Sequence, residues 1–233
     1  MTEPAPSGGR RRAVVRSVAH PSPRAVVLRL EVPDRVAHLP GEHYVVRLTA
    51  ADGYVAQRSY SIASAPADPW VELYVERLED GEVSGFLADT VVVGDELEVQ
   101  GPIGGWFVWR GDTPAVGVAG GSGVVPLVAM LRHAVAVGPA SLLRLVVSAR
   151  TVAELPYAEE LVAAGAVVVA TRATGPGGRA AGRLTAAEVA GALLPGATCF
   201  VCGSAGFADA ASDLLMASGV PARDIRVERF GPS

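Results

Sequence analysis

The chain has 233 residues, of which 50% are hydrophobic and 19% are charged, so it is long enough for one large or two small domains with full cores. Its formal net charge of −4 argues against a general nucleic-acid-binding protein, and no apolar run approaches the length of a membrane span. All 20 basic residues are arginine, which we interpret as coding bias. The two cysteines form no Cys-rich framework, and the N-terminus carries no signal-peptide core, so we expect a cytoplasmic location.

The first half of the chain consists of short stretches rich in Val, Leu and Tyr, separated by turn residues such as Leu39-Pro40-Gly41. Several stretches alternate with a period of two, as in Val71–Glu76. Six closely spaced strands without a helical crossover favour an antiparallel β-barrel over residues 12–110, after a disordered arm over residues 1–11. The expected strands are Ala13–Val18, Ala25–Val32, Tyr44–Thr49, Val55–Ala63, Trp70–Arg77 and Glu96–Gln100.

From residue 111 to residue 233, short apolar strands alternate with segments of helical periodicity. This alternation predicts an α/β domain, in which crossover helices connect the strands of a parallel sheet. The expected strands are Ala115–Ala119, Leu142–Ser148, Val167–Thr171, Cys199–Cys202 and Ile225–Glu228, and the expected helices are Leu127–Val137, Leu155–Ala164, Thr185–Leu193 and Phe207–Ala217.

A cation, an aromatic ring and two hydroxyls occupy four consecutive positions of one predicted barrel strand. With strand periodicity, Arg58 and Tyr60 share one face, whereas Ser59 and Ser61 share the other. An aromatic face beside a guanidinium suits a planar heterocycle that carries a phosphate.

Residues 81–89 interrupt the strand pattern with apolar residues at helical spacing. Gly81 and Ser84 stand near the start of this predicted short helix, where unpaired N–H groups could bind a phosphate. The alternative is a surface turn capped by Ser84.

In the second half, Gly121-Ser122-Gly123 lies between the first predicted strand and the first predicted helix. Such a turn allows a phosphate to approach the backbone closely. Pro126 replaces the third glycine of the common dinucleotide-binding pattern and is tolerated in a first helical turn.

The choice between NADH and NADPH depends on the end of the second strand of the α/β half. A 2′-hydroxyl favours an acidic residue there, and a 2′-phosphate favours arginines and hydroxyls. The chain offers Ser148, Arg150, Arg172 and Arg183, and no acidic residue stands immediately at the strand end. Thr-Arg at 171–172 followed by Gly-Arg at 182–183 resembles bacterial NADPH-dependent ferredoxin/flavodoxin reductases, so we expect NADPH rather than NADH. The alternative is that these arginines are solvated loop residues. Arg179 is either unrelated to this site or an extra contact.

The cysteines and histidines do not indicate a metal site. Cys199 and Cys202 lie in a strand-like context, where positions three apart point to opposite faces, so neither a redox disulfide nor a zinc site is expected. The four histidines are scattered without ligand spacing, and the chain has no plant-type iron–sulfur spacing.

Six short motifs in this order resemble the ferredoxin–NADP(H) reductase superfamily, and the resemblance covers most of the chain after about Arg12. It implies two cofactors, FAD and NADPH. It also implies that Tyr60 lies against the isoalloxazine ring, that Ser61 donates a hydrogen bond near the reacting nitrogen, and that Arg58 pairs with the pyrophosphate. The motifs are Arg-x-Tyr-Ser at 58–61, Gly-x-x-Ser at 81–84, Gly-Pro at 101–102, Gly-Gly-x-Gly-x-x-Pro at 120–126, Cys-Gly at 202–203 and Glu-x-Phe at 228–230.

The resemblance assigns roles to further residues. The segment around Gly81 would hold the flavin pyrophosphate, and backbone groups of residues 75 and 76 would line the flavin. Cys202 and Gly203 would face the nicotinamide, Glu228 would assist proton movement, and Phe230 would shield the flavin. The resulting catalytic candidates are Ser61, Cys202 and Glu228, and the cofactor-binding candidates are Arg58, Ser59, Tyr60, Ser61, Val75, Glu76, Gly81, Val83, Ser84, Gly121, Ser122, Gly123, Ser148, Arg150, Arg172, Arg183, Cys202, Gly203 and Phe230.

The resemblance implies an FAD-dependent oxidoreductase that takes a hydride from NADPH. The reduced flavin would pass single electrons to a separate ferredoxin, flavodoxin or monooxygenase component, which the N-terminal arginines could help to dock if it is acidic. One alternative is an NAD(P)H:free-flavin reductase, against which the pyrophosphate segment at 81–84 speaks. Another is an electron-transfer subunit whose catalysis resides on a second polypeptide.

Overall fold

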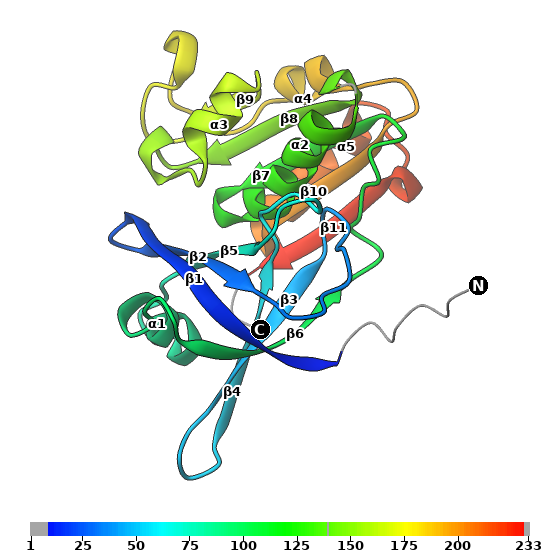
Figure 1. The fold of residues 1–233 in the computed structure, drawn as a ribbon. Coiled ribbons are helices and arrows are strands. Elements are labelled where there is room, and N and C mark those ends of the chain that lie inside the picture. The colour runs from blue at the N-terminus through cyan, green and yellow to red at the C-terminus, as the bar shows by residue number, and fades with distance from the viewer. Residues whose placement is uncertain (1–8, 139, 231–233) are drawn as a thin grey trace, which may run out of the picture. The chain divides into compact units, whose positions relative to one another are not determined.

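The structure is a computed structural model, and it describes residues 9–138 and 140–230. The chain divides into two compact units after Val108 (Figure 1). Residues 1–8 of the predicted N-terminal arm lie outside the described residues. No helix in the described ranges is long and apolar enough to cross a membrane.

The first unit is an antiparallel six-stranded sheet that curls into a barrel. Its strand order is β4-β3-β6-β1-β2-β5, which leaves β4 and β5 at the two ends. An isolated antiparallel bridge between Ile62 and Leu73, with a 2.8 Å hydrogen bond from the Ala63 N–H to the Glu72 carbonyl, joins these ends. The predicted barrel is therefore confirmed. Its elements are β1 (Arg10–Ser22), β2 (Ala25–Glu31), β3 (His43–Thr49), β4 (Val55–Ser61), β5 (Val71–Glu76), α1 (Glu82–Asp89) and β6 (Glu96–Ile103).

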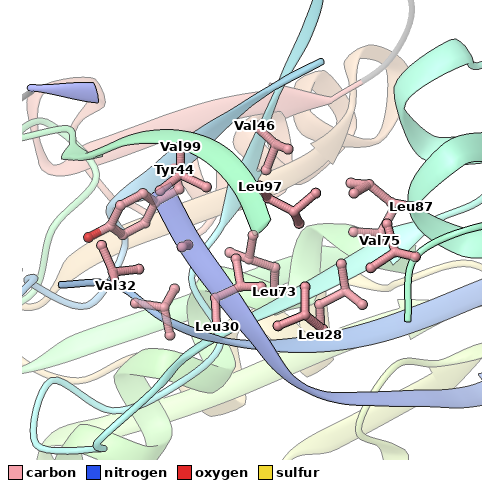
Figure 2. Close-up of a cluster of buried hydrophobic side chains, with 14 of the residues drawn as sticks. Leu28, Leu30, Val32, Tyr44, Val46, Leu73, Val75, Leu87, Leu97 and Val99 are labelled. Atoms are coloured by element: carbon pink, nitrogen blue, oxygen red, sulfur yellow. The ribbon is translucent and has the colours of Figure 1, made fainter. Parts of the chain in front are cut away.

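Alternation along the strands sends one set of aliphatic side chains into the barrel. Figure 2 shows side chains from β2, β3, β5, β6 and α1 that converge on one cluster. Burial of each Leu or Val side chain stabilises the barrel by roughly 1.5–3 kcal/mol. The labelled members are Leu28, Leu30, Val32, Tyr44, Val46, Leu73, Val75, Leu87, Leu97 and Val99.

The outward face of β1 carries arginines, and each of those named below lies beside a carboxylate of a neighbouring strand. Strand β1 already begins at Arg10, inside the expected arm, because this residue pairs with Gln100 of β6. The carboxylates offset the charge of these side chains locally, and a role of the N-terminal arginines in docking an acidic partner stays a prediction. The pairs are Arg10–Glu98 at 3.4 Å, Arg12–Glu96 at 3.2 Å and Arg16–Glu31.

The second unit is a parallel five-stranded sheet with connecting helices, as predicted. Its strand order is β11-β10-β7-β8-β9, and every pairing in it is parallel. Its strands are β7 (Ala115–Gly120), β8 (Leu143–Ala149), β9 (Val167–Ala170), β10 (Thr198–Ser204) and β11 (Ile225–Phe230). Its helices are α2 (Val125–Val137), α3 (Ala158–Ala163), α4 (Ala186–Ala192) and α5 (Ala205–Ala217), with short 3₁₀ turns η1 (Gly121–Val124), η2 (Ala140–Leu142), η3 (Val152–Glu154), η4 (Pro176–Gly178) and η5 (Ala222–Asp224).

Helix α3 is shorter than predicted at its N-terminal end. Leu155 has extended backbone angles (φ −81°, ψ 119°) because it precedes Pro156, whose ring disfavours the helical region for the preceding residue. Tyr157 then adopts a left-handed conformation with φ of 57°. The helix therefore starts at Ala158 rather than at Leu155.

Candidate functional site

Strand β4 places Arg58 and Tyr60 on the barrel face that its register assigns to them. They lie opposite Val46 and Tyr44 of β3, respectively. Tyr60 packs against the barrel core, and burial raises the pKa of its phenol to about 12. The buried Tyr60 hydroxyl has no hydrogen-bond partner among the described residues. The guanidinium of Arg58 is exposed and donates a 2.8 Å hydrogen bond to the Gln57 carbonyl. An unsatisfied phenol beside an exposed guanidinium fits a flavin with its phosphates.

Ser59 and Ser61 share the other face of β4 but differ in burial. Ser61 is 6% exposed, whereas Ser59 is exposed. The barrel closes at Ile62, one residue beyond Ser61, and Ser59 lies farther from that closure. Ser61 is therefore the serine of this strand whose hydroxyl is screened from bulk solvent.

Helix α1 offers the free N–H groups of its first turn, because no side chain caps its N-terminus. The hydroxyl of Ser84 is not available as expected. It accepts a 3.2 Å hydrogen bond from the Leu78 N–H and donates one of 3.3 Å to the Gly81 carbonyl. Gly81 is required here because a Cβ would lie 2.2 Å from the Ser84 hydroxyl. The turn before the helix therefore uses Ser84 internally, and a phosphate at this helix would be bound by backbone N–H groups.

At the end of β5, the two residues expected to line a flavin, Val75 and Glu76, direct their backbone groups to opposite edges of the strand. Arg77 donates its N–H to the Arg24 carbonyl at 2.8 Å, so Val75, two residues earlier, also directs its backbone groups toward β2. The side chain of Val75 is fully buried in the core. The backbone groups of Val75 thus pair within the sheet, and a contact between them and a flavin stays a prediction. Glu76 alternates with Val75 and directs its N–H and carbonyl to the opposite edge of β5.

In the second unit, the parallel register collects candidates from distant parts of the chain at the carboxyl edge of the sheet. Gly120 at the end of β7 pairs with Ser148 of β8. Cys202 of β10 pairs with Ala119 on one side and with Glu228 of β11 on the other. Ligands of open α/β sheets bind at this edge. Gly203 and Phe230 follow at the ends of β10 and β11.

The glycine loop packs directly on strand β10. A Cβ at Gly123 would lie 2.4 Å from the carbonyl oxygen of Cys202 and 2.8 Å from the Cα of Gly203. Gly121 has φ of 57° and open space around its Cα. The loop thus combines a left-handed turn with a backbone-to-backbone contact that excludes any side chain.

Phe207 is part of this edge and is absent from the residues predicted to bind a cofactor. A Cβ at Gly120 would lie 2.7 Å from the Phe207 ring, and one at Gly203 would lie 2.8 Å from it. Phe207 stands in the first turn of α5, where its N–H donates to the Ser204 hydroxyl at 3.4 Å. Gly120 and Gly203, at the ends of the adjacent strands β7 and β10, were the features of the sequence from which a ring packed against both could have been predicted.

Arg150 and Arg172 lie beside each other at the ends of β8 and β9. The Arg172 N–H donates to the Arg150 carbonyl at 2.8 Å, and the Gly182 N–H donates to the Ala170 carbonyl at 3.2 Å, which brings Arg183 to the same edge. All three guanidinium groups are exposed. Within residues 9–138 and 140–230, none of them forms an ion pair or a side-chain hydrogen bond. Three unpaired cations at one sheet edge fit a phosphate-bearing nucleotide.

Cys202 and Glu228 are adjacent titratable groups with perturbed pKa values. Burial, followed by the neighbouring Glu228 carboxylate, raises the pKa of the Cys202 thiol well above its ordinary value. Burial raises the pKa of Glu228 from 4.5 to about 7. Glu228 can therefore take up and release a proton near neutral pH, as a proton relay must.

The raised pKa of Glu228 predicts a pH-dependent stability difference. In the folded chain its carboxylate is disfavoured, so the wild type loses stability as pH rises from about 4.5 to about 7, whereas Glu228→Gln does not. We expect the free energy of unfolding of the variant to exceed that of the wild type by on the order of 1–2 kcal/mol at pH 8, allowing for the partial exposure of Glu228. This difference should vanish below about pH 4.5. Urea unfolding of both proteins at pH 4, 6 and 8 measures it. A stability difference between the two proteins that did not vary with pH would contradict the raised pKa of Glu228 in the folded chain.

The structure also locates the remaining cysteine. Cys199 and Cys202 both lie in β10, and both are buried free thiols. In the described part of the chain, no group of three or more His, Cys, Asp or Glu side chains is arranged to hold a metal ion.

Comparisons with known proteins match both units. Residues 14–108 match the family model of the oxidoreductase FAD-binding domain. The chain is 28% identical over 218 residues to the ferredoxin–NAD(P)(+) reductase component of naphthalene 1,2-dioxygenase/salicylate 5-hydroxylase systems from a Ralstonia species, an alignment that covers 88% of this chain and 64% of the relative. It is 34% identical over 218 residues to a flavohemoprotein of Chromobacterium violaceum, with 84% and 53% coverage.

The fold comparison extends over nearly the whole chain. The crystal structure of the flavohem-like FAD/NAD-binding domain of nitric oxide dioxygenase from Vibrio cholerae superposes with a TM-score of 0.82 at 25% identity and covers 95% of this chain and 99% of that one. The chain spans about half to two-thirds of the length of the two curated relatives.

The barrel with its Arg-x-Tyr-Ser strand and the parallel sheet with its glycine loop define a two-unit protein of the flavin- and nucleotide-binding class. The chain belongs to the ferredoxin–NADP(H) reductase superfamily, and its first unit is an oxidoreductase FAD-binding domain.

Proposed function

We propose that the chain is an FAD-containing reductase that takes electrons from NADPH and passes them to a separate one-electron carrier. The observation that supports the proposal most strongly is that one chain contains two candidate sites, one suited to a flavin and one suited to a nucleotide. One is the barrel strand with Arg58 and the unsatisfied Tyr60 hydroxyl. The other is the sheet edge that collects the glycine loop, Cys202 and Glu228.

In the first unit, the proposed FAD site lies on strand β4 and on the N-terminus of helix α1. Tyr60 offers an aromatic face and an unpaired hydroxyl, Ser61 a screened hydroxyl, and Arg58 a cation for the pyrophosphate. The first-turn N–H groups of α1, near Gly81 and Val83, complete the phosphate contacts. When bound, FAD supplies the exchange between two-electron and one-electron chemistry that side chains lack.

In the second unit, the nucleotide is held at the carboxyl edge. The N–H groups around Gly121, Ser122 and Gly123 bind the pyrophosphate, because Gly121 carries no side chain and has open space around its Cα. Arg150, Arg172 and Arg183 bind the 2′-phosphate, and the buried Ser148 supports the same subsite. The absence of a carboxylate directly after β8 favours NADPH over NADH.

The proposed catalytic residues of the second unit act by position and proton affinity. Cys202 and Gly203 face the nicotinamide from the end of β10, where the Phe207 ring packs against Gly203. Glu228, with its pKa near 7, holds or releases a proton beside the nicotinamide. No nucleophile is required, so the protein contributes alignment and electrostatics.

The proposed electron acceptor is a ferredoxin, a flavodoxin or a monooxygenase component. The Ralstonia relative is a reductase component of dioxygenase and hydroxylase systems, which supports an acceptor on a separate chain. The flavohemoprotein relative supports a second candidate, in which this chain is the reductase part of a longer electron-transfer protein.

An anaerobic visible spectrum of the purified protein, recorded before and after one equivalent of NADPH, tests the proposal. We expect a bound-flavin spectrum that bleaches on addition of NADPH. Bleaching with NADH but not with NADPH would contradict the assignment of NADPH as the coenzyme. A bound flavin that neither coenzyme reduces would favour the alternative of an electron-transfer subunit. A colourless protein that nevertheless reduces added flavin would identify a free-flavin reductase.

A further inference from the structure

The segment between β9 and α4 folds around a single arginine. The side chain of Arg179 is 21% exposed, although it lies in a surface loop that contains little regular structure. Its Nε donates to Oε1 of Glu188, and its Nη2 donates to Oε2 of the same carboxylate at 3.1 Å. The remaining bonds run to backbone carbonyls of the loop itself. They reach Ala180 at 2.8 Å, Gly182 at 3.3 Å and Arg183 at 3.0 Å.

These bonds use every donor that a guanidinium has. An arginine side chain carries five N–H groups and no acceptor, and five hydrogen bonds leave from Arg179. No donor remains for a phosphate. Arg179 is therefore not an additional contact to the nucleotide, in contrast to the exposed and unpaired Arg183 four residues later.

Glu188 connects this arginine to the start of helix α4. Its Oε2 also accepts hydrogen bonds from the Thr185 N–H at 2.9 Å and from the Thr185 hydroxyl at 2.8 Å, within a capping box. The hydrogen bond from Arg179 is the largest influence that lowers the pKa of Glu188, to about 2, so the pair stays charged throughout the physiological range.

The loop is also fastened to the sheet. The Gly182 N–H donates to the Ala170 carbonyl at the end of β9 at 3.2 Å, and the Gly175 N–H donates to the Arg179 carbonyl at 2.8 Å. The backbone on both sides of Arg183 is thus held, by Gly182 on one side and by the Thr185 cap on the other, while its own guanidinium remains free.

We propose that Arg179 and Glu188 form a positioning pair that holds the backbone of Arg183 at the sheet edge and thereby sets the selectivity for a 2′-phosphorylated nucleotide. This inference rests on the proposed NADPH site and adds residues that do not touch the ligand. A loop ordered before binding loses less conformational entropy when the phosphate arrives, so disruption of the pair weakens recognition of that phosphate alone.

Calorimetric titration with 2′,5′-ADP and with 5′-AMP tests the pair without reference to turnover. In Arg179→Lys we expect the Kd for 2′,5′-ADP to rise about tenfold and the Kd for 5′-AMP to stay within about twofold. KM for NADPH should rise in parallel, with kcat unchanged. The lysine keeps the charge and loses the fork of five donors, so a loss of selectivity reports geometry rather than charge.

Glu188→Gln separates positioning from electrostatics. Removal of a carboxylate makes the edge more positive, so simple attraction predicts tighter binding of 2′,5′-ADP. Positioning predicts weaker binding, by about the same tenfold factor, although glutamine retains an oxygen that can accept the Thr185 N–H. The matched control is Arg132→Lys, which disrupts a two-hydrogen-bond ion pair with Glu160 of similar exposure (22% and 35%) outside this loop and should leave both ligands unaffected.

The outcomes distinguish this inference from the proposed function. A wild-type protein that binds 2′,5′-ADP and 5′-AMP equally would overturn the 2′-phosphate site itself. A selective wild type whose selectivity survives both substitutions, or whose Glu188→Gln variant binds 2′,5′-ADP more tightly, would overturn the positioning pair alone. If Arg179→Lys melts well below the wild type, the Glu188→Gln result decides.

Discussion

A chain in which both Arg150 and Arg172 are replaced by alanine is expected to lose at least about 100-fold in kcat/KM with NADPH and less than about threefold with NADH. The backbones of the two residues are joined by a 2.8 Å hydrogen bond, and neither guanidinium has a partner among the described residues. Charge-assisted bonds to a phosphate contribute about 1.5–3 kcal/mol each, and two of them account for the loss. The 2′-hydroxyl of NADH gains no such bonds.

Initial rates with each coenzyme and a dye acceptor measure the effect. Arg144→Ala is the matched control, because Arg144 is an exposed arginine near the amino end of the same strand, β8, and has no ion pair or side-chain hydrogen bond to the residues that the structure describes. It should leave both coenzymes unchanged. If kcat/KM of the double variant fell equally with NADPH and with NADH, the two arginines would not be specific for the 2′-phosphate. If kcat/KM were unchanged with both coenzymes, the two arginines would be solvated loop residues.

The sequence predicted the elements of this fold well because local periodicity determines them. The period of two in Val71–Glu76 and the apolar run at residues 115–119 both correspond to strands, and the arrangement of barrel and parallel sheet is confirmed. The strand order and the closure at Ile62 and Leu73 are not periodic features, since they depend on pairings between residues far apart in the chain.

The roles of individual polar side chains were harder to predict. Ser84 has the composition of a phosphate ligand, yet its hydroxyl is consumed by Leu78 and Gly81. Arg179 and Arg183 are indistinguishable by residue type, but one has all its donors satisfied and the other has none engaged. A sequence identifies which groups can bind a ligand, and the competing internal partners determine which of them remain available.

The parallel register supplies what residue spacing could not. Cys202 and Glu228 are separated by 26 positions, and pairing between adjacent parallel strands places them side by side. Both were candidates because the Cys-Gly motif at 202–203 and the Glu-x-Phe motif at 228–230 resemble those of the ferredoxin–NADP(H) reductase superfamily. The contribution of Glu228 to the raised pKa of Cys202 follows only from the pairing.

Substitution of Gly123 by alanine is expected to abolish binding of NADPH and NADH alike, with an increase of at least about 100-fold in both Kd values. The new Cβ would lie 2.4 Å from the Cys202 carbonyl oxygen, 2.6 Å from its carbonyl carbon and 2.8 Å from the Gly203 Cα. All three atoms belong to the backbone of β10, so no side chain can rotate away. Either the loop or the strand end must move, and both carry proposed nucleotide contacts.

The same substitution should leave the flavin site intact, since Gly123 lies in the second unit and the proposed FAD residues lie in the first. We therefore expect the purified variant to retain flavin absorbance while NADPH no longer bleaches it. Gly191→Ala is the matched control, because Gly191 lies in helix α4 with open space around its Cα, and there alanine should stabilise the helix by about 0.5–1 kcal/mol. Normal coenzyme binding by Gly123→Ala would show that the loop tolerates displacement from β10, and selective loss of NADPH would place the loop near the 2′-phosphate rather than the pyrophosphate.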